Sequence, residues 1–152
     1  MRVGTYDGLR AGERKFSNSR PARRMADFRG LPIRIEIEAG EVKSGVDEAG
    51  RAWSHTYKFP YGEVLKTSSL ADGDPVDVYL GPDQLAPTAF VVHQSKSDGN
   101  YDEDKCFLGF ATEAAAVLAY KQHGPVWGFG SIDSMTFEEF RRGYLAANRR
   151  HQ

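Results

Sequence analysis

From residue 32 onward the chain repeats short strand-like stretches between turn residues, and this pattern limits the fold more than any other feature. Residues 32–38 (PIRIEIE) alternate apolar and polar side chains, which is typical of a strand with one buried face. Four further stretches are rich in β-branched or aromatic residues and are bounded by Gly, Pro or Asp: 52–59, 76–80, 90–93 and 106–110. Five short strands of this kind predict a small, closed or nearly closed OB-like β-barrel.

Two helices are predicted after the strands. Thr112 fits an N-cap for an Ala-rich run that ends at Gly124. Thr136 and Glu139 have the spacing of a capping box at the start of the second helix. The expected fold is therefore α+β, a five-stranded OB-like β-barrel with two C-terminal helices on one side.

Length and composition agree with one compact domain. The chain has 152 residues, of which 40% are hydrophobic and 27% charged. Its single cysteine, Cys106, excludes an internal disulfide and a thiolate metal cluster. No apolar stretch is long enough for a membrane span or a secretory signal, so we expect a cytoplasmic protein with no membrane partner.

Residues 1–31 form a basic segment ahead of this domain. They hold eight Lys and Arg against three Asp and Glu, a net charge of +5, which leaves −6 for the remainder of a chain whose total is −1. We expect an extended basic arm over 1–31 and a folded domain over 32–152. A positive arm suits an acidic partner, nucleic acid included, and the alternative is a solvated tail or a segment that packs against a neighbouring subunit.

Three aspartates lie within six residues of one another: Asp72, Asp74 and Asp77. Carboxylates this close repel one another unless a cation lies between them, and Mg²⁺ prefers oxygen ligands. Asp77 alternates with Val76 and Val78 and therefore points to the opposite face of its strand. The pattern predicts a Mg²⁺ site, with Mn²⁺ as the alternative cation. A plain turn is the other interpretation, because Asp, Gly and Pro are common in turns.

The run DGDPVDV at residues 72–78 resembles the signature of the soluble, Mg²⁺-dependent inorganic pyrophosphatases of the barrel type. A closer resemblance extends from residue 33 to the end of the chain. The stretches that carry it include GRAW at 50–53, YDEDKCFLGF at 101–110 and GSIDSMTFEEF at 130–140. In these stretches the chain resembles the pyrophosphatase-like domain of bacteriophage and mobile-element proteins. This resemblance implies a phage or prophage origin, with a location in the host cytoplasm or within a phage particle.

The resemblance also implies roles for particular side chains. Metal ions would be held by four carboxylates: Asp72, Asp77, Asp98 and Glu103. The general base would be Asp74, with Tyr61 and Lys105 as the other catalytic residues. Phosphate oxygens would be contacted by four further side chains: Lys43, Arg51, Tyr120 and Lys121. Glu36 would be an outer acidic residue.

The second acidic cluster has more than one interpretation, because Asp102, Glu103 and Asp104 are adjacent in the sequence. A shift of one residue changes which carboxylate points into the site. Glu103 is preferred because it shares a strand face with Lys105.

Two functions of different classes follow. The first is an enzyme that hydrolyses inorganic pyrophosphate, or a related phosphoanhydride, with Mg²⁺-activated water. The alternative is a weak or inactive phage virion component that keeps the fold as an interaction module. A homo-oligomer, or a phage assembly that contacts the N-terminal arm, is the expected macromolecular partner.

Overall fold

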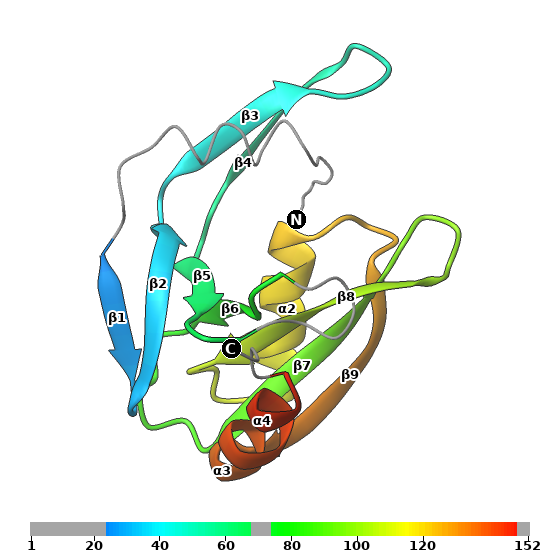
Figure 1. Cartoon of the computed structure of the whole chain (residues 1–152). Helices are drawn as coiled ribbons and strands as arrows, with labels where there is room; N and C mark the ends of the chain where they lie inside the picture. Colours follow the sequence, from blue (N-terminus) through cyan, green and yellow to red (C-terminus); the bar gives the residue numbers. More distant parts are fainter. Residues whose placement is uncertain (1–23, 68–73, 149–152) are drawn as a thin grey trace.

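The computed structural model of the chain describes residues 24–67 and 74–148 (Figure 1). Its strands are β1 (Met25–Phe28), β2 (Leu31–Ile37), β3 (Val42–Val46), β4 (Ala52–Thr56), β5 (Tyr61–Val64), β6 (Asp77–Leu80), β7 (Thr88–Ser95), β8 (Tyr101–Leu108) and β9 (Phe129–Thr136). Its helical segments are α2 (Glu113–His123), α3 (Phe137–Glu139), η1 (Phe140–Tyr144) and α4 (Leu145–Ala147).

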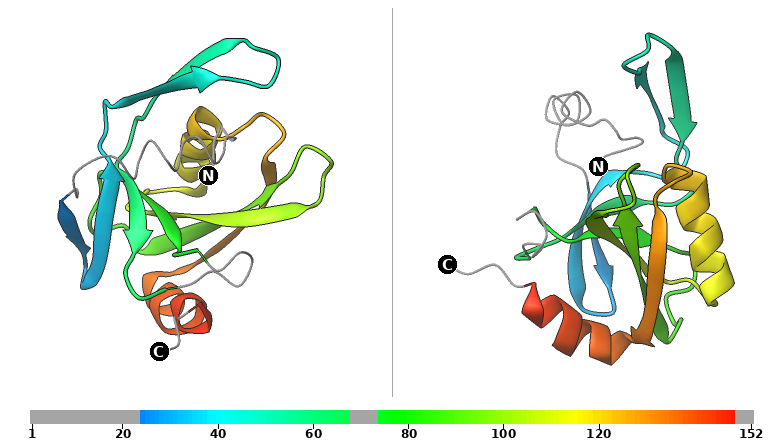
Figure 2. Two further views of the ribbon diagram at one scale, coloured as in Figure 1. Left: turned by 45° about the horizontal axis from the view of Figure 1, so that its top comes forward. Right: turned by 90° about the vertical axis from the view of Figure 1, so that its right-hand side faces the viewer.

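Seven of the strands form one curved sheet in the order β1-β2-β5-β6-β8-β7-β9. Its neighbouring strands are antiparallel except β6 and β8, which run parallel at the centre of the sheet. Strands β3 and β4 form a separate hairpin that projects from the rest of the molecule (Figure 2).

The α+β class is confirmed, but the five-stranded barrel is not. Within the described residues β1 and β9 stand at the two ends of the strand order, so the sheet does not close. The five predicted strands correspond to β2, β4, β6, β7 and β8, and the other four were missed for lack of a clear pattern. In β9, for example, exposed residues come in pairs between half-buried ones, so the period-two signal of a strand with one buried face is absent.

Apolar side chains pack on both faces of the sheet. One cluster joins Ile33, Val78 and Cys106 to Phe137 and Phe140 of the C-terminal helical segments. The other packs the sheet against Ala116, Ala119 and Tyr120 of α2. Figure 2 shows α2 and the C-terminal helical segments in different places around the sheet. The two faces thus have separate cores, and β8 contributes alternate side chains to each.

Both predicted helix starts are confirmed. The Thr112 hydroxyl accepts a hydrogen bond from the backbone N–H of Ala115 at the start of α2. Thr136 and Glu139 form both hydrogen bonds of the capping box, at 2.8 and 3.0 Å. The second helix runs from α3 to α4 with a π-helical stretch, η1, in its middle.

The last residues of the predicted basic arm belong to the sheet. Strand β1 pairs with β2 through a tight turn, and the backbone N–H of Ile35 donates to the carbonyl of Arg24. Residues 1–23 lie outside the described part of the chain, so the arm itself stays a prediction. In the described ranges, the helices are all too short or too polar to cross a bilayer.

Candidate active site

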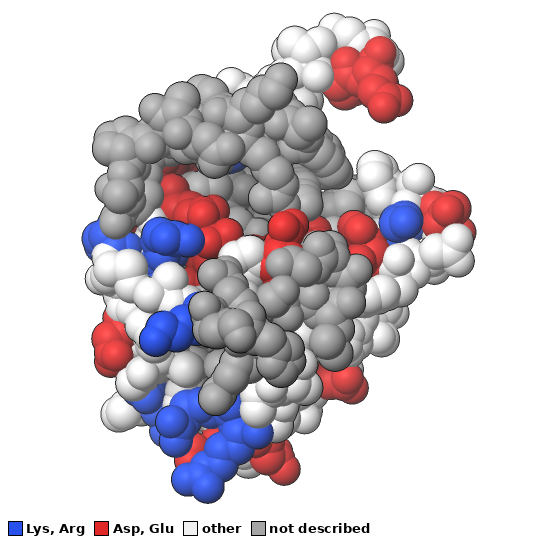
Figure 3. Space-filling view, in the orientation of Figure 1, with Lys and Arg blue, Asp and Glu red and all other residues white. Residues whose placement is uncertain are grey.

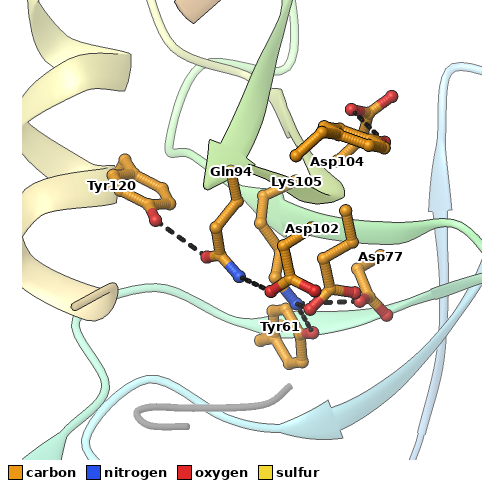
Figure 4. A network of polar contacts seen from close by, with 9 residues as sticks. Tyr61, Asp77, Gln94, Asp102, Asp104, Lys105 and Tyr120 are labelled. Atoms are coloured by element: carbon orange, nitrogen blue, oxygen red, sulfur yellow. Dashed lines mark hydrogen bonds and ion pairs between the residues drawn. The ribbon is translucent and has the colours of Figure 1, made fainter. Parts of the chain in front are cut away.

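Lys105 is the centre of a buried polar cluster on the face of the sheet that also packs against α2. Its ammonium group lies 2.9 Å from Asp77 Oδ2 and 3.4 Å from Glu103 Oε2, and it donates to the Tyr61 hydroxyl at 2.9 Å (Figure 4). Only 4% of the Lys105 side chain is exposed, against 14% for Asp77 and 6% for Glu103. One cation therefore serves two carboxylates largely shielded from water.

Strand pairing explains why these residues meet. Val78 of β6 lies opposite Cys106 of β8, and both side chains are buried in the core on the other face. Because side chains alternate along a strand, the neighbours Asp77 and Lys105 point together to the site face. Glu103, two residues before Lys105, shares that face, as the sequence predicted.

Tyr61 enters the site from β5, next to β6. Its ring lies 4.6 Å from that of Tyr79, which stacks in turn on Phe107 at 5.1 Å. Burial, with a smaller contribution from the Asp77 charge, raises the pKa of the Tyr61 phenol well above its usual range. The hydroxyl stays protonated and keeps a proton to donate while it accepts from Lys105.

Two glutamates extend the cluster towards β2. The register of β2 and β5 shifts between Ile35 and Ile37, so Glu36 is an extra residue in the pairing. Burial and the negative charges of Glu63 and Asp77 raise the pKa of Glu36 to about 7. Glu63 has a partner of its own, Arg34, at 2.9 Å.

A second register shift determines which faces of the sheet the three adjacent acids of β8 point to. Gln94 of β7 lies opposite Glu103, while Ser95 lies opposite Tyr101, so Asp102 is an extra residue. The shift allows Asp102 to accept a hydrogen bond from the Gln94 amide (Figure 4). Burial, and then the charges of Glu103 and Asp102, raise the pKa of the Tyr120 phenol, so both carboxylates lie on the side of Tyr120. Sequence alternation favoured Glu103 alone and could not show that Asp102 joins it.

Asp104 takes no part in this cluster and binds groups on the opposite face. It accepts hydrogen bonds from the hydroxyls of Tyr101 and Tyr144, at 2.8 and 2.7 Å, and lies 2.7 Å from His93 Nδ1. The other ring nitrogen of His93 lies 2.8 Å from Asp133. Burial opposes the charged form of His93, but its bonds to Asp133 and Asp104 outweigh burial and raise its pKa.

Gln94 links the cluster to α2, and the sequence analysis missed it. Its side-chain oxygen accepts from the Tyr120 hydroxyl at 2.8 Å, and its amide nitrogen donates to Asp102 at 3.0 Å. Gln94 is 7% exposed and Tyr120 is 1% exposed. A neutral amide within an apolar strand carried no sequence signal, because its partners are distant in the chain.

Three other predicted residues come from the β3–β4 hairpin and the β7–β8 turn. Arg51 is at the end of the β3–β4 hairpin, 80% exposed and paired with Asp47 at 3.3 Å. Asp98 is exposed in the β7–β8 turn, where it accepts from the backbone N–H of Asn100. Lys43 is buried in β3, opposite His55. Their predicted roles stay predictions.

Asp74 and Lys121 lie next to elements that contribute to the Lys105 cluster or contact it. Asp74 is partly buried and lies just before β6, whose start is held by a 2.9 Å hydrogen bond from the Val76 N–H to the Thr67 hydroxyl. Lys121 follows Tyr120 on α2, and its ammonium lies 5.9 Å from the centre of the Phe129 ring. Asp72 lies outside the described residues.

Acidic side chains outnumber cations in this part of the molecule. They gather across the middle of the face shown in Figure 3. Five lie in or next to the Lys105 cluster: Glu36, Glu63, Asp77, Asp102 and Glu103. Their carboxylate oxygens are the ligands that Mg²⁺ prefers. Burial first, and then the negative charges of Glu63 and Asp77, raise the pKa of Glu36, and the charge of Arg34 opposes this rise only in part.

The donor chemistry therefore fits Mg²⁺. The described residues do not by themselves form a complete cage, because residues 24–67 and 74–148 contain no group of three or more His, Cys, Asp or Glu side chains placed to hold a metal ion. Mg²⁺ usually keeps several waters and takes only one or two protein carboxylates, together with substrate phosphates.

Buried cationic and phenolic donors beside several carboxylates are groups that can bind phosphate oxygens and a divalent cation. A comparison with family models identifies the family directly. The inorganic pyrophosphatase model matches residues 13–144, so the chain belongs to the inorganic pyrophosphatase family. Comparisons with curated proteins and with solved structures give no match. The family match bears on the fold and the chemistry, and the phage origin stays a prediction.

Proposed function

We propose that the protein hydrolyses inorganic pyrophosphate, or a related phosphoanhydride, with the aid of Mg²⁺. The observation that carries the proposal is the buried ammonium of Lys105 held by Asp77, Glu103 and Tyr61. This cluster joins donors for phosphate oxygens to ligands for a divalent cation within one network, in a chain of the pyrophosphatase family.

Each member of the cluster has a defined part in the proposal. Asp77 and Glu103, with Asp72 and Asp98 from the sequence analysis, would hold Mg²⁺, with Mn²⁺ as the alternative. The bound cation supplies an acidified water and offsets phosphate charge. Lys105 would turn from the carboxylates to a phosphate oxygen, and the protonated Tyr61 hydroxyl would donate to another.

The reaction is an in-line displacement at one phosphorus. A water oxygen forms the new bond to phosphorus, the bond from that phosphorus to the bridging oxygen breaks, and the second phosphate leaves with the bridging oxygen. Asp74 takes the proton of the attacking water. Asp74 lies two residues before Val76, whose backbone N–H is held by the Thr67 hydroxyl.

Four further side chains are assigned to the outer part of the substrate site. Tyr120 connects to the cluster through Gln94 and precedes Lys121 on α2, so both are assigned to phosphate oxygens. Lys43 and Arg51 belong to the projecting hairpin and are assigned to the substrate from the sequence alone. Binding of sister subunits or of a phage assembly through the N-terminal arm is a separate proposal.

The test is phosphate release from pyrophosphate by the full chain in Mg²⁺, with chelator as the metal-free arm. Asp74→Asn and Asp77→Asn are each expected to lower the rate by about 10²-fold or more. Asp83→Asn is the matched control, because Asp83 is exposed and its Oδ1 acceptor for the Leu85 N–H is kept. Release by the wild type no faster than by Asp74→Asn contradicts the enzyme and favours the interaction module.

A further inference from the structure

Gln94 occupies an unusual place in the sheet, because both neighbouring strands change register beside it. In β8 the extra residue is Asp102, between the pairs Gln94–Glu103 and Ser95–Tyr101. In β9 the extra residue is Gly130, between the pairs His93–Ser131 and Gln94–Phe129. Bulges on both sides of one residue re-aim the side chains at that level of the sheet.

The bulge in β9 depends on a glycine. A Cβ atom at Gly130 would lie 2.5 Å from the His93 carbonyl oxygen and 2.7 Å from the Ser95 hydroxyl. Such contacts are far too short, so only glycine allows β9 to approach β7 there. The local backbone is thus specialised around Gln94 and not merely irregular.

The amide of Gln94 uses this position to bond in two directions. The Tyr120 hydroxyl of α2 donates to the Gln94 side-chain oxygen, and the Gln94 side-chain nitrogen donates to Asp102 of β8 (Figure 4). These partners fix which end of the amide faces which group, since a phenol donates to oxygen and a carboxylate accepts only from nitrogen. If the amide were flipped, its oxygen would face the Asp102 carboxylate and that hydrogen bond would be lost.

We propose that Gln94 is a positioning residue that holds the Asp102 carboxylate beside Glu103, so that these two carboxylates face a divalent cation. The same amide holds the Tyr120 hydroxyl on the side of the sheet that carries both carboxylates. This inference rests on the proposed function and adds Asp102 to the carboxylates that receive the cation. Gln94 acts through Asp102 and Tyr120 and does not itself contact the reacting atoms.

A neutral amide suits this task better than a carboxylate. Glutamate at position 94 could still accept from Tyr120 but would repel Asp102, and leucine would lose both bonds. Residues that orient metal ligands typically change metal affinity by about 10–100-fold when removed. A residue that only stabilises the fold would lower stability equally at every Mg²⁺ concentration.

The experiment measures the thermal midpoint of the full chain across a Mg²⁺ titration. Gln94→Leu is expected to raise the Mg²⁺ concentration at which the midpoint begins to rise by about 10–100-fold. Gln94→Glu is expected to start from a lower midpoint without metal and to show a larger rise with Mg²⁺ than the wild type. Tyr120→Phe keeps the Gln94–Asp102 bond and is expected to change the Mg²⁺ dependence far less. The control is Gln84→Glu at an exposed glutamine.

Pyrophosphate hydrolysis, measured on the same proteins, separates the two hypotheses. An active wild type whose Gln94 variants keep the same Mg²⁺ dependence overturns the role of Gln94 and leaves the enzyme intact. An inactive wild type whose variants follow the expected order supports the positioning role and overturns the enzyme. A wild type with neither activity nor a Mg²⁺ shift overturns both.

Discussion

Lys105→Met is the most informative single change, because it removes a cation that Asp77 and Glu103 share. The methionine keeps most of the apolar length of lysine, so the variant tests charge rather than volume. Lys105 is 3% exposed and lies within 3.4 Å of both carboxylates. The variant leaves two buried carboxylates without their ammonium partner.

Loss of one partner of a buried ion pair costs about 3–5 kcal/mol of unfolding free energy. Because one ammonium serves two carboxylates here, we expect the upper half of that range in metal-free buffer. For a chain of this size each kcal/mol changes the thermal midpoint by about 2–4 °C, so the midpoint should fall by roughly 8–20 °C. The assay is urea unfolding followed by far-ultraviolet circular dichroism with chelator present.

Two comparisons separate the charge from other effects. Asp77→Asn added to Lys105→Met should recover about 1–2 kcal/mol, because one uncompensated charge is removed. Lys96→Met, at an exposed lysine in the β7–β8 turn, should change stability by less than about 0.5 kcal/mol. If Lys105→Met costs no more than Lys96→Met, the ammonium does not hold the cluster together and the reasoning is refuted.

Two further changes test the fold around the site. The folded-state pKa of Glu36 is raised from 4.5 to about 7 by burial and by Glu63, so the contribution of Glu36 to stability should be full below about pH 4.5 and should be lost as pH rises through 7. Glu36→Gln should remove that loss. Its unfolding free energy should exceed that of the wild type by up to about 3 kcal/mol at pH 8 and differ little at pH 4.5, as measured by urea unfolding at both pH values. Equal effects at the two pH values would contradict the charge assigned to Glu36. Gly62→Ala would place a Cβ 2.2 Å from the backbone oxygen of Arg34 and should cost about 2–4 kcal/mol, whereas Gly143→Ala has open space and should be neutral or stabilising by up to about 1 kcal/mol. The same denaturation assay checks the pair, and equal stability of the two variants would show that β2 and β5 tolerate a side chain between them.

The sequence predicted local structure well and long-range arrangement poorly. Thr112 and Thr136 begin helices as expected because capping depends on residues three positions apart. Strand β5 was missed because it is only four residues long and contains Gly62. The hairpin of β3 and β4 was half missed, since its strands pair mainly with each other and leave one face exposed. No local pattern reports how many strands a sheet contains.

The site shows the same division. Asp77, Lys105 and Glu103 could be placed from strand alternation, because alternation is a local property. Glu36 and Asp102 are extra residues at register shifts, so alternation in the sequence does not report their orientation. Gln94 was missed because its importance comes from contacts with Tyr120 and Asp102, which only the folded chain brings together. The acidic surplus of the site depends on these irregular positions.

Neighbouring residues of β8 contact different parts of the molecule on the two faces of the sheet. Glu103 and Lys105 face the candidate site, while Asp104 binds Tyr144 and thereby ties the sheet to the C-terminal helical segments. Without a bulge, strict alternation would place the side chains of Asp102 and Asp104 on the same face of the sheet, the face that carries His93 and Tyr144. The extra residue at Asp102 breaks this alternation and adds a carboxylate to the site without removing Asp104 from its structural contacts. One irregularity in pairing thus lets three consecutive acids divide between the candidate site and the contacts of the opposite face, and so a change of one residue in the register of β7 and β8 would disturb both faces of the sheet.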